Sequence, residues 1–276
     1  MNPSVRLWCT QVLAIVRLEL KKNFSFRRAF PVFLLASMQL VLFAAHWFAA
    51  LRQWTDCDGS SDLTFFARVF QTFFLRLVVF FGCVVIFLNL FRGEVLQKSL
   101  HYYFLAPVRR EVLVVGKYLA GLVMAVAVFG GSAALSYLML CQHIALTSSH
   151  ALAGPALSDL GAYTGVTALA CVGYGAAFLL LGMLFRNPIV PAISVLLWES
   201  FIVFFPPLLK KVSVIFYLES LCPVRVPFDG PGALFAIPAD PTPAYLAAPG
   251  LVLLTAAILA VAAVKIRRME ISYGTE

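Results

Sequence analysis

The sequence predicts an all-α integral membrane protein with six transmembrane helices in a single domain, 1–276. Hydrophobic residues make up 62% of the chain and charged residues only 12%, a balance that points to a lipid rather than an aqueous surrounding. The hydrophobic residues gather in runs of about 20 or more, long enough to cross a ~30 Å hydrocarbon layer as helices. Such runs are helical because the bilayer offers no water to backbone polar groups. The predicted spans are 30–51, 69–91, 118–141, 161–185, 188–209 and 245–264.

The first element, 1–29, is predicted to be an amphipathic helix lying in the membrane interface. At helical spacing its polar side chains fall on one stripe and its apolar side chains on the opposite side. A helix of this kind rests its Lys and Arg side chains on lipid phosphates. The alternative is a solvated basic tail that only sets the orientation of the chain. The polar stripe is Arg6, Thr10, Arg17, Lys21 and Arg28, and the apolar side is Trp8, Val12, Ile15 and Val16.

The distribution of positive charge orients the six spans. Of the 21 Lys and Arg residues, 15 lie in the N-terminal segment, the connections 92–117 and 185–188, and the C-terminal tail. The alternate connections hold only five. The positive-inside rule therefore places both termini in the cytoplasm, in the inner (plasma) membrane of the cell. A nucleic-acid partner is excluded, because the basic residues do not gather into one soluble domain.

The connection 210–244, between the last two predicted spans, is long and apolar and carries many Pro and Gly residues. Short helices that dip back into the membrane would fit this composition, since irregular backbone is tolerated there when protein covers it. Proline and glycine prevent any one of these helices from spanning. A folded external cap is the alternative.

The segment between the second and third spans, "EVLQKSLHYYFLAPVRREVLVVGKYLAG", interrupts the apolar sequence with charges and a proline. Its first part, 94–104, contains no Gly or Pro and predicts a short helix that ends at Pro107. Arg109, Arg110 and Glu111 then begin a new element that continues through Gly116 and Lys117 into the third span. Such an exposed element could dock on a soluble partner, or it could be an ordinary loop held by lipid headgroups.

This segment resembles the signature of the ABC-type-2 permeases, the membrane subunits of one class of ATP-binding-cassette transporter. Lys98 stands where that family commonly has a glycine. The predicted layout is also similar to the family's, with an interfacial helix, six spans and short helices before the last span. The residues that carry the resemblance are Glu94, Ser99, Leu100, Leu105, Ala106, Pro107, Val108, Arg110, Gly116 and Lys117.

The resemblance implies an exporter subunit, and it makes 94–105 a coupling helix that contacts a separate nucleotide-binding ATPase. Gln97, Lys98 and Arg109 would join the matched residues in that contact. The chain has no G-x-x-x-x-G-K-[ST] motif, so ATP and Mg would be bound by the partner and this chain would hold no cofactor. Six spans form half a transporter in that family, which implies a second permease copy as a homodimer or heterodimer. The residues do not choose a cargo.

Two ionisable residues, Arg76 and Glu199, lie inside predicted spans, where a charge facing lipid would cost about 2.5–3.5 kcal/mol. They could line a translocation pathway, pair with each other, or make structural polar contacts. Two cysteines, Cys57 and Cys222, are predicted to lie outside the membrane, where a disulfide between them is possible in an oxidising compartment. No cysteine or histidine spacing indicates a metal site.

Two other classes of function compete with the transporter subunit. A secondary transporter or channel would normally show broken spans at matching places in the two halves and chains of intramembrane carboxylates, which the sequence lacks. A membrane enzyme of lipid metabolism would need acidic residues or histidines clustered near one interface. The connections predicted to be cytoplasmic offer only Glu94 and Glu111 for such a cluster.

Overall fold

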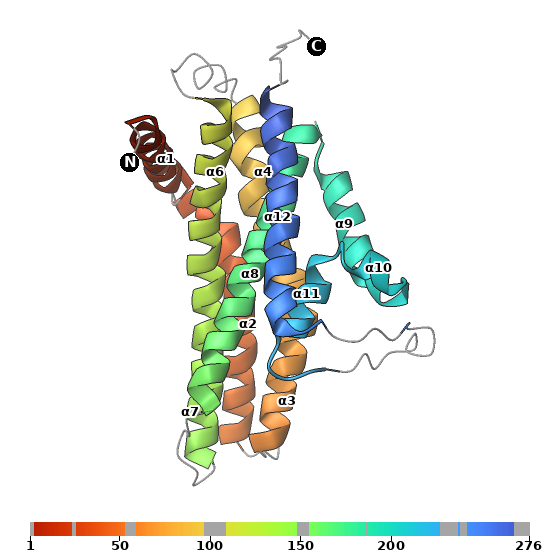
Figure 1. Cartoon of the computed structure of the whole chain (residues 1–276). Coiled ribbons are helices and arrows are strands. Elements are labelled where there is room, and N and C mark those ends of the chain that lie inside the picture. Colours follow the sequence, from red (N-terminus) through yellow and green to blue (C-terminus); the bar gives the residue numbers. More distant parts are fainter. Residues whose placement is uncertain are drawn as a thin grey trace.

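Long helices running along one common axis dominate the computed structural model (Figure 1). The structure describes residues 3–23, 26–52, 59–96, 109–147, 155–185, 187–226, 237 and 242–267. Every regular element in these ranges is a helix. The all-α fold class is therefore confirmed for the described part of the chain.

Within these described ranges, five helices are long and apolar enough to cross a membrane, each with at least 21 residues in its candidate span. Two of them are continuous stacks that contain a π-helical stretch, a widened form often found at functional sites. The five are α2 (Phe26–Leu51), α3–η1–α4 (Gly59–Val69, Phe70–Val79, Phe80–Leu96), α6–η2–α7 (Arg110–Ala125, Val126–Gly130, Gly131–Thr147), α8 (Pro155–Leu184) and α12 (Ala244–Arg267).

The predicted fifth span, 188–209, differs from the structure. Its helix α9 (Ile189–Phe201) has 13 residues, or about 20 Å, and continues only as the short η3 (Ile202–Phe204). Phe205 is extended (φ −93°, ψ 157°), as expected for a residue that precedes a proline, and Pro206 follows. The chain then turns through α10 (Pro207–Lys210) and α11 (Val214–Leu221) instead of completing a single-helix crossing.

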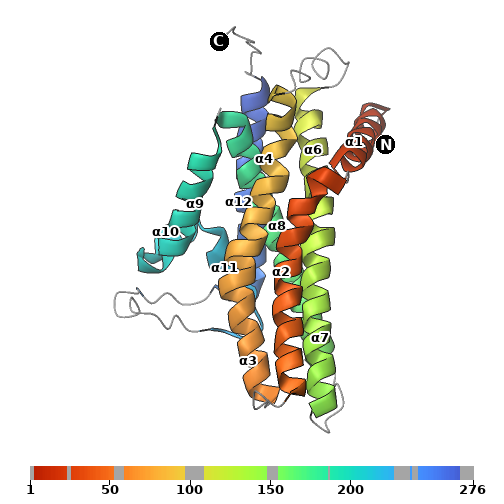
Figure 2. The ribbon, with the colours of Figure 1, turned by 180° about the vertical axis from the view of Figure 1, so that it is seen from behind.

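Helix α11 packs into the bundle, against α8, α12 and η1. Its apolar side chains Val214, Ile215, Tyr217 and Leu218 are buried. The short helices α10 and α11 therefore lie between α9 and α12, and α11 packs against the bundle. Figures 1 and 2 show α9 and α10 standing away from the bundle on one side while α11 turns back toward it.

The start of α1 and the end of α12 lie at the same end of the bundle, which we call the head end (Figure 1). The head end is formed by the last residues of α4, α8 and α12 and the first residues of α6, with α1 (Pro3–Asn23) running at an angle beside them. The chain therefore leaves α4 and α8 and enters α6 at this end. That this end faces the cytoplasm stays a prediction.

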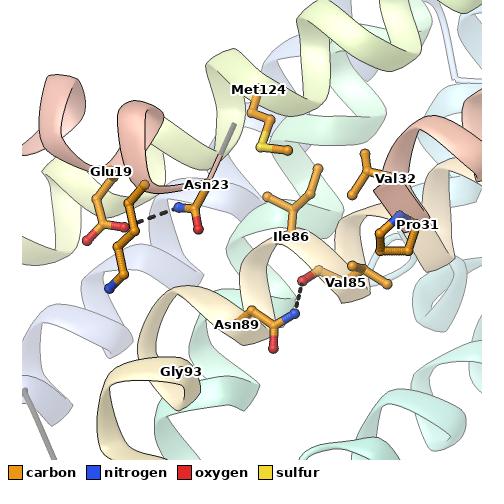
Figure 3. A pocket seen from close by; sticks show the side chains of 10 residues that line it. Glu19, Asn23, Pro31, Val32, Val85, Ile86, Asn89, Gly93 and Met124 are labelled. Carbon is orange, nitrogen blue, oxygen red and sulfur yellow. Dashed lines mark hydrogen bonds between the residues drawn. The ribbon is translucent and has the colours of Figure 1, made fainter. Parts of the chain in front are cut away.

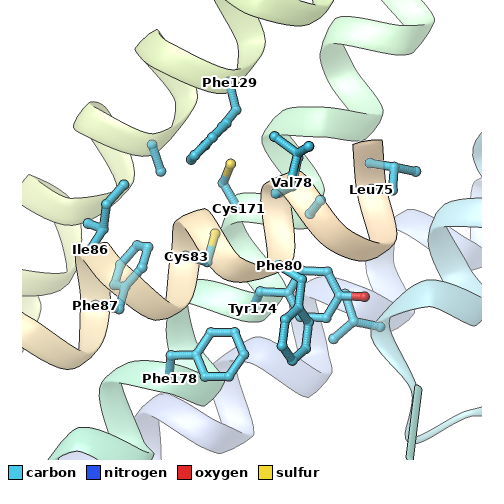
Figure 4. Close-up of a cluster of buried hydrophobic side chains, with 14 of the residues drawn as sticks. Leu75, Val78, Phe80, Cys83, Ile86, Phe87, Phe129, Cys171, Tyr174 and Phe178 are labelled. Atoms are coloured by element: carbon cyan, nitrogen blue, oxygen red, sulfur yellow. The ribbon is translucent and has the colours of Figure 1, made fainter. Parts of the chain in front are cut away.

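The core of the bundle is aromatic and centres on α4 and α8 (Figure 4). Phe80 stacks edge-to-face on Phe178, with ring centroids 4.9 Å apart, and the Phe87 ring lies so close to Gly175 that a Cβ there would come within 2.5 Å of it. Five of the phenylalanines in the predicted second span are fully buried among other helices, where they pack the core. The five are Phe70, Phe74, Phe80, Phe87 and Phe91.

Candidate functional site

A buried ion pair joins α1 to the bundle at the head end. The Lys117 ammonium on α6 donates to the Glu19 carboxylate on α1 at 2.5 Å and to the backbone carbonyl oxygen of Leu90 on α4 at 3.0 Å. Both charged side chains are at most 1% exposed. The other Glu19 carboxylate oxygen accepts a hydrogen bond from Asn23 at 3.2 Å. Because the two charges are paired and further hydrogen-bonded, their removal from water is compensated, and three helices are fixed at one point.

Gly116, next to Lys117, lets α1 approach α6 closely. A Cβ at this position would lie 2.8 Å from a methyl carbon of Ile15 on α1, closer than real side chains come. The neighbouring Lys117 then finds Glu19 one turn further along α1. Gly116 therefore permits the close contact between α1 and α6, and Lys117 supplies the positive charge that pairs with Glu19.

The start of α6 is also attached to the ends of α1 and α12. The Arg109 guanidinium lies 4.8 Å above the Trp8 ring on α1. Arg110 donates to the carbonyl oxygens of Ile266 and Arg267, the last residues of α12, at 3.4 and 3.2 Å. A cation at a helix C-terminus satisfies carbonyl groups that have no partner within the helix. Glu111 pairs with the Arg267 side chain as well.

The sequence-predicted coupling residues divide into two groups in the structure. Arg109 and Arg110 lie on the head-end surface of the bundle, while Lys117 lies inside it and is no part of an exposed element. Glu94 is in the last turn of α4. The rest, Gln97, Lys98, Ser99, Leu100 and Pro107, lie outside the described residues, in the connection that joins Leu96 to Arg109.

Glu19 is the functional residue that sequence reasoning missed. It is the only acidic residue in the first 29, and at helical spacing it falls on the apolar side of α1, beside Ile15. A carboxylate in that position would face hydrocarbon unless it had a partner. This single misplaced charge was the signal that could have predicted a cation on a neighbouring helix.

The other intramembrane charges form a second network, around the α9–α11 hairpin. The Glu199 carboxylate accepts from the Ser213 hydroxyl at 2.7 Å and from the backbone N–H groups of Val214 and Ile215 at 3.0 Å, so it caps the N-terminus of α11. Arg76 donates to the Glu219 carboxylate at 2.5 Å and to the Glu199 backbone carbonyl oxygen at 3.4 Å.

Arg76 and Glu199 are therefore close, but they meet through a backbone carbonyl group and not as a charge pair. Gln71, also on η1, donates to the carbonyl oxygen of Val224 at 2.6 Å. The π-helical η1 thus holds the hairpin near the end of α9, at α11 and just beyond α11. Arg76 and Glu199 thus have hydrogen-bond partners within the fold, and their role in a translocation pathway stays a prediction.

Cys222 is buried beside this network, and burial together with the neighbouring Glu219 raises the pKa of its thiol to about 12. Its proposed partner Cys57 lies outside the described residues, so the disulfide stays a prediction. Within the described residues, no three His, Cys, Asp or Glu side chains gather as metal ligands.

No known family model matches this chain, and no curated protein is significantly similar to it. Function must therefore be inferred from the segment and contacts described above.

Proposed function

We propose that this protein is the permease subunit of an ATP-driven ABC transporter, an exporter, and that it forms half of the translocation pathway. The motif in 94–117 and the layout of the head end support this proposal. The observation that carries it is the Lys117 contact, because Lys117 bonds to α1 and α4 from within α6. The connection 97–108 joins α4 to α6 just beyond that point. Any force on the connection thus reaches three helices together.

The coupling step follows from these attachments. A separate ATPase subunit, which binds ATP and Mg, docks on 94–105 and moves when nucleotide is bound or hydrolysed. The end of α4 and the start of α6 move with it as one body, because Lys117 and Glu19 fix them to α1. Arg110 passes the motion on to the end of α12. Conformational energy from the ATPase thereby reaches both sides of the bundle.

The proposal includes the orientation of the chain and its assembly. The head end faces the cytoplasm, because it receives the segments that hold 15 of the 21 basic residues. The α9–α11 hairpin then enters the membrane from the head end and leaves it on the outer side, as the sixth crossing. A second permease copy, identical or not, completes the pathway.

The test is co-purification of the protein from its native membrane in mild detergent, with its partners identified by mass. A Glu94→Arg/Lys98→Glu variant reverses the charge at two positions of the proposed docking helix and leaves its net charge unchanged. Arg110 is left unchanged, because its contacts to α12 are internal. A Lys211→Glu variant, with its charge reversal on the exposed side of the hairpin, is the matched control.

An ATPase of the ATP-binding-cassette class is expected with the wild type and the control, and it should be lost from the Glu94→Arg/Lys98→Glu variant. Absence of any ATPase, even after cross-linking, would contradict the proposal. One feature would then favour a secondary transporter or channel. Helix α9 stops after 13 residues and α11 packs inside the bundle, as the broken helices of such transporters do.

A further inference from the structure

A cavity of about 360 Å³ opens at the head end between α1, α2, α4 and α6 (Figure 3). It belongs neither to the connection 97–108 nor to the hairpin network, and its volume lies within the range of small-molecule sites. Its apolar part includes Val32, Ile86 and Met124, and Asn23 and Asn89 give it two amide groups. A ligand that fills this space must therefore carry both a hydrocarbon portion and a polar group.

The charged side chains that line the cavity already interact within the chain. Glu19 is paired with Lys117. Lys22 also has an interaction partner in the chain. The two amides are therefore the polar groups that we expect a ligand to use.

Both amides can donate and accept further hydrogen bonds. In the part of the chain that the structure describes, Asn23 donates one N–H to Glu19 at 3.2 Å, and Asn89 donates one to the Val85 carbonyl oxygen at 2.7 Å. Each amide has a second N–H and a carbonyl oxygen besides. A hydroxyl group is the best match to these two amides, because it accepts from an N–H and donates to an oxygen, whereas an ester or ether oxygen only accepts.

The depth of Asn89 gives it a need for such a partner. Asn89 is exposed and lies within the candidate membrane span Ser61–Phe91, seven residues, or about 10 Å, before the end of α4 at Leu96. An amide group that faces hydrocarbon without its hydrogen bonds is unfavourable. The polar group of a ligand in the cavity would supply these hydrogen bonds.

We propose that the cavity binds one neutral lipid that carries a free hydroxyl group, of the diacylglycerol class. The hydroxyl bonds to Asn23 and Asn89, and the start of an acyl chain lies along Val32, Ile86 and Met124. The bound lipid joins the end of α1 to α4, beside the point where the Glu19–Lys117 pair fixes α1 to α6. The site does not depend on whether an ATPase docks on 94–105.

The measurement is lipid binding to the delipidated full-length protein in detergent, by native mass spectrometry. Three lipids share two octanoyl chains and differ only at the third glycerol carbon. Dioctanoylglycerol carries a hydroxyl there, its methyl ether carries only an acceptor, and dioctanoyl phosphatidic acid carries an anion. The wild type should bind one dioctanoylglycerol about fivefold more tightly than the methyl ether, because the ether loses one donated hydrogen bond. Phosphatidic acid should bind more weakly than dioctanoylglycerol.

Two pairs of variants locate the site. Asn89→Leu removes an amide from the cavity wall. Thr72→Leu is its control, since Thr72 is also exposed and also bonds to the carbonyl oxygen four residues earlier, but does not line the cavity. Gly93→Leu places a side chain in the cavity, because a Cβ at Gly93 meets nothing within 4 Å, and Gly131→Leu makes the same change at an equally open position outside it. Leucine favours a helix over glycine, so both glycine variants should remain folded.

Asn89→Leu should weaken the binding of dioctanoylglycerol about fivefold and remove most of its advantage over the methyl ether. Gly93→Leu should abolish binding of all three lipids. Thr72→Leu and Gly131→Leu should match the wild type.

Other outcomes would overturn the proposal. Equal binding of dioctanoylglycerol and its methyl ether would show that no hydroxyl is recognised, and tighter binding of phosphatidic acid would indicate an anion site. Unchanged binding in Gly93→Leu, or an equal loss in Asn89→Leu and Thr72→Leu, would place the lipid elsewhere. Binding of none of the three lipids would leave the cavity to water. Displacement of the lipid by glycerol at millimolar concentration would indicate a site for a soluble polyol.

Discussion

Substituting Lys117 with methionine should destabilise the protein strongly. Methionine keeps the unbranched shape of the lysine stem but removes the ammonium group. The Glu19 carboxylate, 1% exposed, would then keep only its hydrogen bond from Asn23. Removing one partner of a buried ion pair typically costs about 3–5 kcal/mol, because the remaining charge stays buried without compensation. We expect a loss of this size in the free energy of unfolding.

The double variant Glu19→Met/Lys117→Met should recover most of this loss. Replacing both members of a buried pair with apolar side chains is often neutral, so we expect the double variant within ~1 kcal/mol of the wild type. Arg267→Met is the control. It breaks the Glu111–Arg267 pair at a position where the arginine side chain is 66% exposed, and such pairs contribute less than ~1 kcal/mol.

The assay is reversible unfolding of the purified protein in mixed detergent micelles with increasing dodecyl sulfate, followed by tryptophan fluorescence. A single variant that loses less than ~1 kcal/mol would refute the argument that Lys117 and Glu19 are a buried pair. The argument would also be refuted if the double variant lost as much free energy of unfolding as Glu19→Met and Lys117→Met lose together.

Three further predictions concern other contacts. Gly116→Val should lower thermal stability in detergent by about 1–3 kcal/mol, because the new side chain clashes with Ile15. Adding Ile15→Ala should restore the lost stability. If stability is not restored, α1 does not approach α6 closely. Glu199→Leu should lower the free energy of unfolding by at least ~2 kcal/mol, because the donors at the start of α11 lose their acceptor. Glu199→Gln should assemble normally. Transport by the Glu199→Gln variant should fall only if Glu199 has a role in a cavity. Maleimide at pH 8 should label the exposed Cys9 quickly and the buried Cys222 slowly in folded protein, as peptide mapping would show; equal rates would contradict the raised pKa of Cys222.

The five long helices could be predicted from the sequence, because a continuous apolar run of this length indicates a helix that can cross a membrane. The same criterion failed over 188–209. The run 188–209 is rich in apolar residues overall, but it also contains Pro206 and Pro207, and the extended backbone of Phe205 before them ends the helix. The adjacent prolines were the available signal for a short α9. Hydropathy identifies apolar segments, and proline positions decide where those segments bend.

The candidate site was harder to predict, because its contacts join residues far apart in the sequence. Motif reasoning correctly singled out Gly116 and Lys117 but assigned Lys117 to an exposed coupling surface. Its burial depends on Glu19, 98 residues earlier, and on the carbonyl oxygen of Leu90. The α11 cap by Glu199 depends likewise on how the hairpin closes. Local patterns identified which charges needed partners, and only the packing of the helices supplied those partners.

The most direct test of the central claim is site-specific photo-cross-linking in living cells. A photoreactive amino acid is placed at position 98, in the proposed docking helix, and at position 211 as a control. The account predicts that irradiation attaches an ATP-binding-cassette ATPase at position 98 and not at position 211, and that the Glu94→Arg substitution suppresses the adduct. Cross-links to lipid alone at position 98 would contradict an ATPase partner and leave the segment as a membrane-anchored loop.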